Sequence, residues 1–169
     1  MRRLYLLRHA KARREREASD RDRQLHRKGI RQGAALAAWL AQRGQTIDLV
    51  LCSPARRTCD TLALVLPAFA ARPAVEFPEA LYLASTETLH GIVSEVDDQA
   101  SGLMLVGHND GIHQFALDLA RSADLTRLSG FPTGALALFE FDIERWALLR
   151  PRSGRLAAYV DPDRLVDAA

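Results

Sequence analysis

Short apolar runs interrupt the charged sequence at intervals, and each run has the length of a buried strand. They are rich in Leu, Ile, Val and Met and are bounded by polar or turn-forming residues. A continuous apolar run of roughly four to eight residues is typical of a strand covered on both faces. The sequence therefore predicts strands at residues 3–7, 47–52 and 103–106, with a weaker one at 75–77.

Between these runs, apolar residues recur at the spacing of a helix. The predicted helices span residues 28–43, 54–66, 85–96 and 109–121. On the first helix, the expected buried face consists of Ile30, Ala34, Ala37, Leu40 and Ala41. Ser53 is expected to cap the second helix and Pro54 to open it, because a Ser side chain satisfies free N–H groups and Pro fits the first turn.

The C-terminal third departs from this alternation. Residues 135–141 are typical of a strand, 142–144 of a turn and 146–149 of a returning strand. The whole pattern predicts an α/β fold in a single domain, residues 1–169. We expect three layers: a doubly wound, mainly parallel sheet with helices on both faces, ending in a C-terminal antiparallel hairpin.

Composition narrows the class of protein further. Hydrophobic residues make up 48% of the 169 and charged residues 26%, which suffices for a core and excludes extensive disorder. No apolar run approaches the roughly 18–20 residues of a membrane span, and the apolar stretch at the start is too short for a signal peptide. Cys52 and Cys59 match no zinc or redox spacing. We therefore expect a cytoplasmic protein with reduced thiols.

Charge is unevenly distributed, although the net charge is only +2. Residues 1–31 hold twelve Arg or Lys against four Asp or Glu, whereas residues 32–169 hold eleven against seventeen. Nearly all the cationic residues are Arg, which favours bidentate contact with phosphate and carboxylate groups. The basic segment is consistent with a nucleic-acid arm, a membrane patch or part of a small anion site.

The predicted strand ends favour the anion site. Ligands bind beyond the carboxyl ends of parallel strands. Arg8 and His9 follow the first strand, Arg56 and Arg57 come shortly after the second, and His108 follows the third. A parallel sheet brings these ends to one edge, where two histidines and several guanidinium groups form a cationic pocket. The natural complement of such a pocket is a phosphate or phosphoryl group.

These residues resemble the signature blocks of the histidine phosphatase superfamily, which includes the phosphoglycerate mutases. The matching blocks are Leu6-Leu7-Arg8-His9-Ala10, Ser53-Pro54-Ala55-Arg56-Arg57-Thr58-Cys59-Asp60-Thr61 and Leu105-Val106-Gly107-His108. Three further stretches are similar to the SixA-type phosphohistidine phosphatase branch: Asp22-Arg23-Gln24-Leu25 with Gly29, Tyr82-Leu83-Ala84-Ser85, and Phe131-Pro132-Thr133-Gly134-Ala135. The blocks occur in order over residues 3–141.

The resemblance implies a role for each residue of the pocket. His9 would be the nucleophile, attacking phosphorus through a neutral ring nitrogen and forming a phosphohistidine intermediate. Arg8 and Arg57 would neutralise the phosphoryl oxygens, with Arg57 rather than its neighbour in register with the family. His108 would donate a further hydrogen bond to the same oxygens. No metal or cofactor is implied, because the guanidinium groups take the charge-neutralising role.

The general acid is less clearly indicated by the resemblance. Larger relatives use a carboxylate to protonate the leaving oxygen, and the candidates in this chain are Glu79 and Asp22. A phosphorylated histidine leaves as an imidazole, which needs less protonation than an alkoxide. A SixA-like enzyme therefore tolerates a poorly placed acid.

The expected substrate is a phosphohistidine domain of another protein. Only about 27 residues separate Pro78 from Leu105, too few for a large lid, so an open site is expected by analogy with the family. The alternatives are a small-molecule phosphomonoesterase, a phosphoglycerate mutase-like enzyme, and a non-catalytic phosphate-binding module. A nucleic acid is not an expected partner, because no aromatic residues are interleaved with the basic ones. A membrane is not expected either, because no apolar run is long enough to span it.

Overall fold

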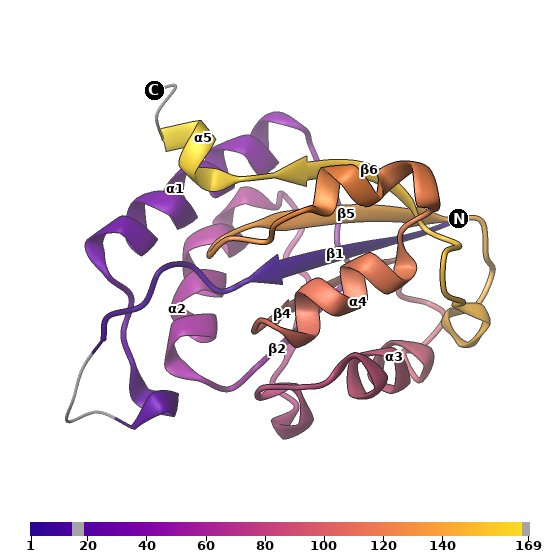
Figure 1. The fold of residues 1–169 in the computed structure, drawn as a ribbon, viewed down its shortest axis with the longest axis horizontal. Helices are drawn as coiled ribbons and strands as arrows, with labels where there is room; N and C mark the ends of the chain where they lie inside the picture. Colours follow the sequence, from indigo (N-terminus) through magenta and orange to yellow (C-terminus); the bar gives the residue numbers. More distant parts are fainter. Residues whose placement is uncertain (15–18, 167–169) are drawn as a thin grey trace.

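The part of the chain that the structure describes, residues 1–14 and 19–166 of a computed structural model, is built on one mixed sheet. Its strands stand in the order β3-β2-β4-β1-β5-β6 (Figure 1). The bounds are β1 Arg2–Arg8, β2 Leu49–Cys52, β3 Ala74–Glu76, β4 Gly102–Gly107, β5 Leu136–Phe141 and β6 Arg155–Val160. β1, β2, β3 and β4 run parallel, whereas β5 and β6 are antiparallel to their neighbours.

Helices cover both faces of this sheet. The α-helices are α1 Arg27–Gln42, α2 Arg56–Val65, α3 Thr86–Ser94, α4 Gly111–Leu119 and α5 Pro162–Val166. Five 3-10 turns join them: η1 Asp20–Asp22, η2 Leu66–Ala68, η3 Glu79–Leu81, η4 Ser122–Leu128 and η5 Trp146–Leu148. One apolar cluster joins α1 and α2 to one face of the sheet, and another joins α3 and α4 to the opposite face. The predicted three-layer, mainly parallel α/β fold is confirmed.

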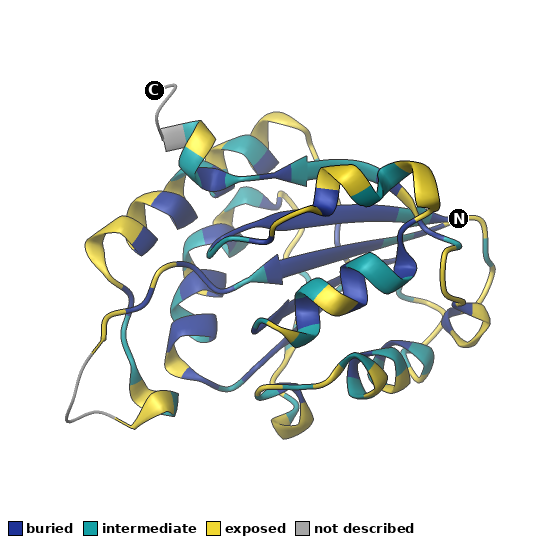
Figure 2. Ribbon diagram, viewed as in Figure 1, coloured by how far each residue is buried: buried dark blue, intermediate teal, exposed yellow. Residues whose placement is uncertain are grey.

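The central strands form as continuous apolar runs because both of their faces are covered. β4 is buried along its whole length, and β1 is buried from Leu4 to Leu7 (Figure 2). Alternate side chains go to opposite clusters: Leu6 contacts the α3 and α4 side, whereas Tyr5 contacts the α1 and α2 side. The hydrophobic pattern therefore decides that β1 lies in the interior of the sheet.

The C-terminal hairpin exists, but its returning strand was predicted at the wrong residues. Residues 146–148 form the turn η5, and the strand that pairs with β5 is β6, further along the chain. Trp146 is fully buried, and its indole Nε1 donates to the carbonyl of Ala100 at 2.7 Å. Its backbone N–H donates to Asp98 at 2.9 Å. These contacts hold the segment under the loop before β4, so tertiary packing overrides its strand propensity.

The buried face of α1 also differs from the prediction. Ile30 is 49% exposed, and the residues buried on α1 are Gly29, Gln32, Gly33, Leu36 and Leu40. Helix α1 buries this face because its two glycines lie very close to neighbouring segments. A Cβ on Gly29 would lie 2.2 Å from the carbonyl oxygen of Lys11, and one on Gly33 would lie 2.5 Å from Leu64 of α2. The two glycines let the helix pack tightly where larger apolar residues do not fit.

Gln32 uses this close approach to join three segments. Its Oε1 accepts the backbone N–H of Lys11 at 2.9 Å, just after β1. Its Nε2 donates to Asp163 of α5 at 2.8 Å and lies 3.4 Å from the hydroxyl of Thr133. The side chain is 1% exposed, so these bonds are shielded from water. The loop after β1 is thereby fastened to the loop before β5 and to the last helix.

Gly134 makes a second connection between the same two loops. Its backbone N–H donates to the carbonyl of His9 at 3.0 Å, and its φ is +77°. A Cβ at this position would lie 2.9 Å from Pro162. Only glycine adopts this conformation at such close packing without strain.

We expect Gly134→Ala to lower the free energy of unfolding by about 1–3 kcal/mol, the cost of a strained left-handed residue. Gly91→Ala is the matched control. Gly91 lies in α3 with open space where a Cβ would be, so its replacement should raise stability by roughly 0.5–1 kcal/mol. Urea melts of the two variants check this, and equal stabilities would contradict it.

Candidate active site

The carboxyl ends of β1, β2 and β4 meet at one edge of the sheet, as predicted. His9 follows β1 directly, and its backbone is held on both sides. Its N–H donates to Gly107 at 3.0 Å, at the end of β4, and its carbonyl accepts from Gly134. The next residue, Ala10, donates its N–H to the hydroxyl of Thr61 at 2.9 Å. His9 is therefore fixed by three elements at once.

The hydrogen bond of the His9 ring decides which of its two nitrogens carries the proton. Its Nδ1 lies 2.8 Å from the carbonyl oxygen of Ala10, so Nδ1 carries the proton and donates it. The other nitrogen, Nε2, consequently keeps its lone pair. The pKa of His9 is lowered to about 4, mainly by burial and also by the positive charges of Arg57 and Arg8, against a raising effect of the Ala10 hydrogen bond. His9 is thus neutral at physiological pH.

His108 lies beside His9, with 5.4 Å between the ring centroids. Its Nε2 is 2.7 Å from the hydroxyl of Ser53, and its Nδ1 accepts from Nη2 of Arg57 at 3.1 Å. Because a guanidinium group can only donate hydrogen bonds, Nδ1 of His108 must be the unprotonated nitrogen and Nε2 the donor. Burial and then the charge of Arg57 lower the pKa of His108 to about 3. The second histidine is also neutral.

Ser53 therefore has a different role from the one predicted. Helix α2 begins at Arg56 with Ala55 as its N-cap, and no side chain caps it. The Ser53 hydroxyl binds His108 instead, and its carbonyl accepts from the hydroxyl of Thr58 at 2.7 Å. The turn between β2 and α2 thus serves to place His108.

Arg57 enters the site from the first turn of α2 and is 3% exposed. Its neighbour Arg56 is exposed and pairs with Asp60 at 3.8 Å on the helix surface. The structure places Arg57, and not Arg56, against the histidines, as the register of the family block implies. The predicted residues Arg57, His9 and His108 are brought together.

Arg8 reaches the site from the end of β1. Its Nη1 donates to the carbonyl of Phe131 at 2.7 Å, which also accepts from Asn109 at 3.2 Å. Arg8 Nε and Asn109 Oδ1 are buried without a hydrogen-bond partner among the described residues. A buried N–H without a partner is costly, so Arg8 retains a donor for an anion.

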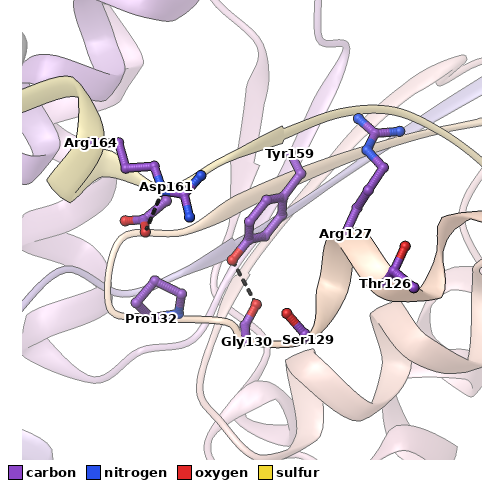
Figure 3. Close-up of a pocket in the computed structure, with 8 residues that line it drawn as sticks. All are labelled: Thr126, Arg127, Ser129, Gly130, Pro132, Tyr159, Asp161 and Arg164. Atoms are coloured by element: carbon purple, nitrogen blue, oxygen red, sulfur yellow. Dashed lines mark hydrogen bonds and ion pairs between the residues drawn. The ribbon is translucent and has the colours of Figure 1, made fainter.

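The loop that holds Arg8 also forms one wall of a separate cavity of about 420 Å³ (Figure 3). The cavity is lined by Thr126, Arg127, Ser129, Gly130, Pro132, Tyr159, Asp161 and Arg164. Tyr159 lies between the two arginines, and its hydroxyl donates to the carbonyl of Gly130 at 2.6 Å. That bond steadies the residue before Phe131. The cavity contains neither histidine of the site, so we assign its wall a supporting role.

Asp20 is a site residue that the sequence analysis missed. It lies in η1, and its Oδ2 accepts from Arg57 at 3.0 Å and from the hydroxyl of Tyr82 at 2.7 Å. Its Oδ1 accepts from Arg23 at 3.0 Å. The hydrogen bond from Tyr82, followed by those from the two arginines, lowers the pKa of Asp20 to about 2. The sequence gives no signal for Asp20, because its partners Arg57 and Tyr82 lie 37 and 62 residues away.

The two predicted acids lie elsewhere. Asp22 is exposed, and the bonds of its carboxylate among the described residues are to Ser19 of its own turn. The carboxylate of Glu79 is bound by Arg21 at 2.7 Å through both oxygens, and its side chain is 73% exposed. Neither carboxylate contacts His9 or His108 in the described structure. Glu79 and Asp22 therefore remain predictions without a supporting geometry.

The described residues contain neither a cluster of metal-binding side chains nor a membrane-spanning helix. No group of three or more His, Cys, Asp or Glu residues in residues 1–14 and 19–166 is arranged to hold a metal ion. Within the same ranges, no helix is long and apolar enough to cross a membrane.

Comparison with known proteins identifies the family. Residues 4–81 match the model of the histidine phosphatase superfamily, branch 1. The uncharacterized protein Rv1276c of Mycobacterium tuberculosis is 32% identical over 162 residues, covering 92% of this chain and 99% of that protein. Together with the site, these matches show that the chain belongs to the histidine phosphatase superfamily.

Solved structures place the chain near one group within that superfamily. The "Putative Phosphohistidine Phosphatase SixA from Nakamurella multipartitia" is 29% identical, with a TM-score of 0.82 over 95% of this chain and 96% of that one. The "putative phosphohistidine phosphatase SixA from Agrobacterium tumefaciens" is 28% identical, with a TM-score of 0.81 over 95% and 98%.

The neutral histidines generate a prediction about stability. An unfolded histidine has a pKa of about 6.5, so between about pH 6.5 and 4 the unfolded chain binds protons that folded His9 and His108 exclude. The free energy of unfolding should therefore fall as the pH drops through this window, by about 1.4 kcal/mol per pH unit for each histidine. Urea melts at several pH values across this range give the free energy of unfolding as a function of pH. Its dependence on pH should be weaker in a His9→Asn/His108→Asn double variant than in the wild type. An unchanged dependence on pH would contradict the assignment.

Proposed function

We propose that this protein is a phosphatase that removes a phosphoryl group from a phosphohistidine of another protein, through a phosphohistidine intermediate on His9. The observation that carries the proposal is the His9 ring, neutral and with Nε2 unprotonated, beside the guanidinium groups of Arg8 and Arg57. Membership of the superfamily and the likeness to structures named SixA support it.

The reaction would proceed in two displacements. In the first, the lone pair of His9 Nε2 attacks phosphorus while the bond to the leaving group breaks on the opposite side. Arg8, through its unpartnered Nε, and Arg57 balance the charge of the equatorial oxygens. His108, for which the resemblance implied a hydrogen bond to the same oxygens, has Nε2 bound to Ser53 and would instead keep Arg57 directed into the pocket through Nδ1. In the second step, water attacks the phosphoryl group on His9 and returns the free enzyme.

Exposed residues at the mouth favour a protein-borne substrate. The segment between β3 and β4 contains only η3 and α3, so no inserted domain is present over these described residues. Phe77 and Leu83 of this segment are 50% and 55% exposed, and Leu83 directly follows Tyr82, which lies edge-on to His108. An open mouth with exposed apolar side chains suits contact with another protein surface.

The substrate class is tested by offering a phosphohistidine-bearing carrier protein and, separately, several phosphosugars. We expect the carrier to be dephosphorylated and the sugars to turn over slowly. Rapid turnover of the sugars with an untouched carrier would instead support a small-molecule phosphomonoesterase. Binding of the carrier without any turnover would support a phosphate-binding module.

The intermediate has its own test. His9→Ala should abolish both turnover and the acid-labile phosphoryl label on the protein, because no other nitrogen takes the place of Nε2. His90→Ala, on α3 and outside the pocket, is the matched control and should keep both. Labelling that persists in the His9 variant would refute the mechanism.

A further inference from the structure

Asp20 lies on the solvent side of the phosphoryl pocket. Arg57, which it contacts at 3.0 Å, is 3% exposed at its side chain, whereas Asp20 is 48% exposed. His9, at the base, is 9% exposed. Because a leaving group departs on the side opposite the nucleophile, it must leave toward the mouth. Asp20 and Tyr82, joined by a 2.7 Å hydrogen bond, form one wall of that mouth.

Among the described residues, three donors contact the Asp20 carboxylate, which leaves one of its acceptor positions for a substrate. A carboxylate has about four lone-pair positions. Arg57 and Tyr82 use Oδ2, and Arg23 uses one position of Oδ1. Arg57 also donates to the backbone carbonyl of Asp20, so the residue is held at both its backbone and its side chain. The free position is thus on a rigidly held oxygen.

The carboxylate is an acceptor and not an acid. Three donors stabilise its ionised form and hold its pKa at about 2, so it carries no proton to give at neutral pH. A group in this position assists a leaving group only by accepting a hydrogen bond from it or by opposing its negative charge. That restriction selects among phosphorylated substrates.

Resting on the proposed function, we propose that Asp20 recognises the leaving imidazole of phosphohistidine by accepting the N–H of its unphosphorylated ring nitrogen. The substrate binds with this nitrogen protonated from solvent, so that its phosphorylated ring is cationic, and the anion stabilises that proton while the substrate is bound. As His9 Nε2 forms its bond to phosphorus, the P–N bond breaks and its electron pair passes to the substrate nitrogen. The product is a neutral imidazole that retains its one proton on the other nitrogen. No general acid enters this balance.

Asp20 would then disfavour other phosphate compounds. An alkyl phosphate leaves as an alkoxide and needs a proton, which Asp20 lacks. A phosphate ester whose leaving group carries a carboxylate or second phosphate is repelled by the same anion. Asp20 therefore favours a substrate whose phosphorylated ring is cationic and carries an N–H while it is bound.

The test compares Asp20→Asn with wild type on two substrates. With a phosphohistidine carrier protein, kcat/KM should fall about ten- to a hundred-fold, the loss expected for a hydrogen bond to a charged group. With p-nitrophenyl phosphate, whose leaving group needs no proton and carries no N–H, it should stay within roughly threefold or rise. Asp20→Glu should restore part of the carrier activity. Asp142→Asn, the same charge change at an exposed position just after β5, should leave both activities unchanged.

A pH profile separates recognition from a structural effect. On the carrier, the rate should decline at alkaline pH as the bound substrate ring loses its proton. In Asp20→Asn the midpoint of this decline should move to lower pH, because the anion no longer stabilises the protonated ring.

The outcomes distinguish the two proposals. Equal losses on both substrates with an unmoved midpoint would overturn the role of Asp20 while leaving the phosphohistidine phosphatase intact. If the wild-type protein hydrolyses p-nitrophenyl phosphate but not the carrier, the proposed function itself fails. A selective loss on the carrier with a shifted midpoint supports both.

Discussion

The guanidinium group of Arg57 is the contact on which the rest of the site depends. It donates to His108 on one side and to Asp20 on the other, and is itself almost entirely removed from water. A buried cation is tolerated only with partners that satisfy its charge and its N–H groups. Asp20 supplies the charge and His108 supplies a neutral acceptor. The one arginine thereby fixes the tautomer of His108 and the position of the mouth.

Burial and positive charge act in the same direction on the two histidines. Both effects disfavour the protonated ring, so the same cationic pocket keeps His9 and His108 neutral. A single carboxylate against His9 would reverse this balance by favouring imidazolium. The structure keeps Glu79 with Arg21 and Asp22 with Ser19, and it leaves Asp20 beyond Arg57.

The sequence alone predicted the features that follow from the order of strands and helices along the chain. His9 and His108 follow buried apolar runs, so their meeting at one edge follows from the parallel sheet. Features decided by contacts between distant segments escaped prediction. Trp146 is held by the loop before β4, and the face of α1 is chosen by the space at Gly29 and Gly33. Asp20 has no distinguishing neighbours in sequence, because its partner Tyr82 lies 62 residues away.

Gln32 connects the loop after the first strand with segments near residues 133 and 163. β1, moreover, pairs with β4 and β5, both of which are synthesised much later. On the ribosome, His9 therefore emerges among the first residues but cannot take up its folded position until nearly the whole chain has been synthesised. A nascent or C-terminally shortened chain would carry His9 without its setting, so enzymatic competence arrives with the last helix.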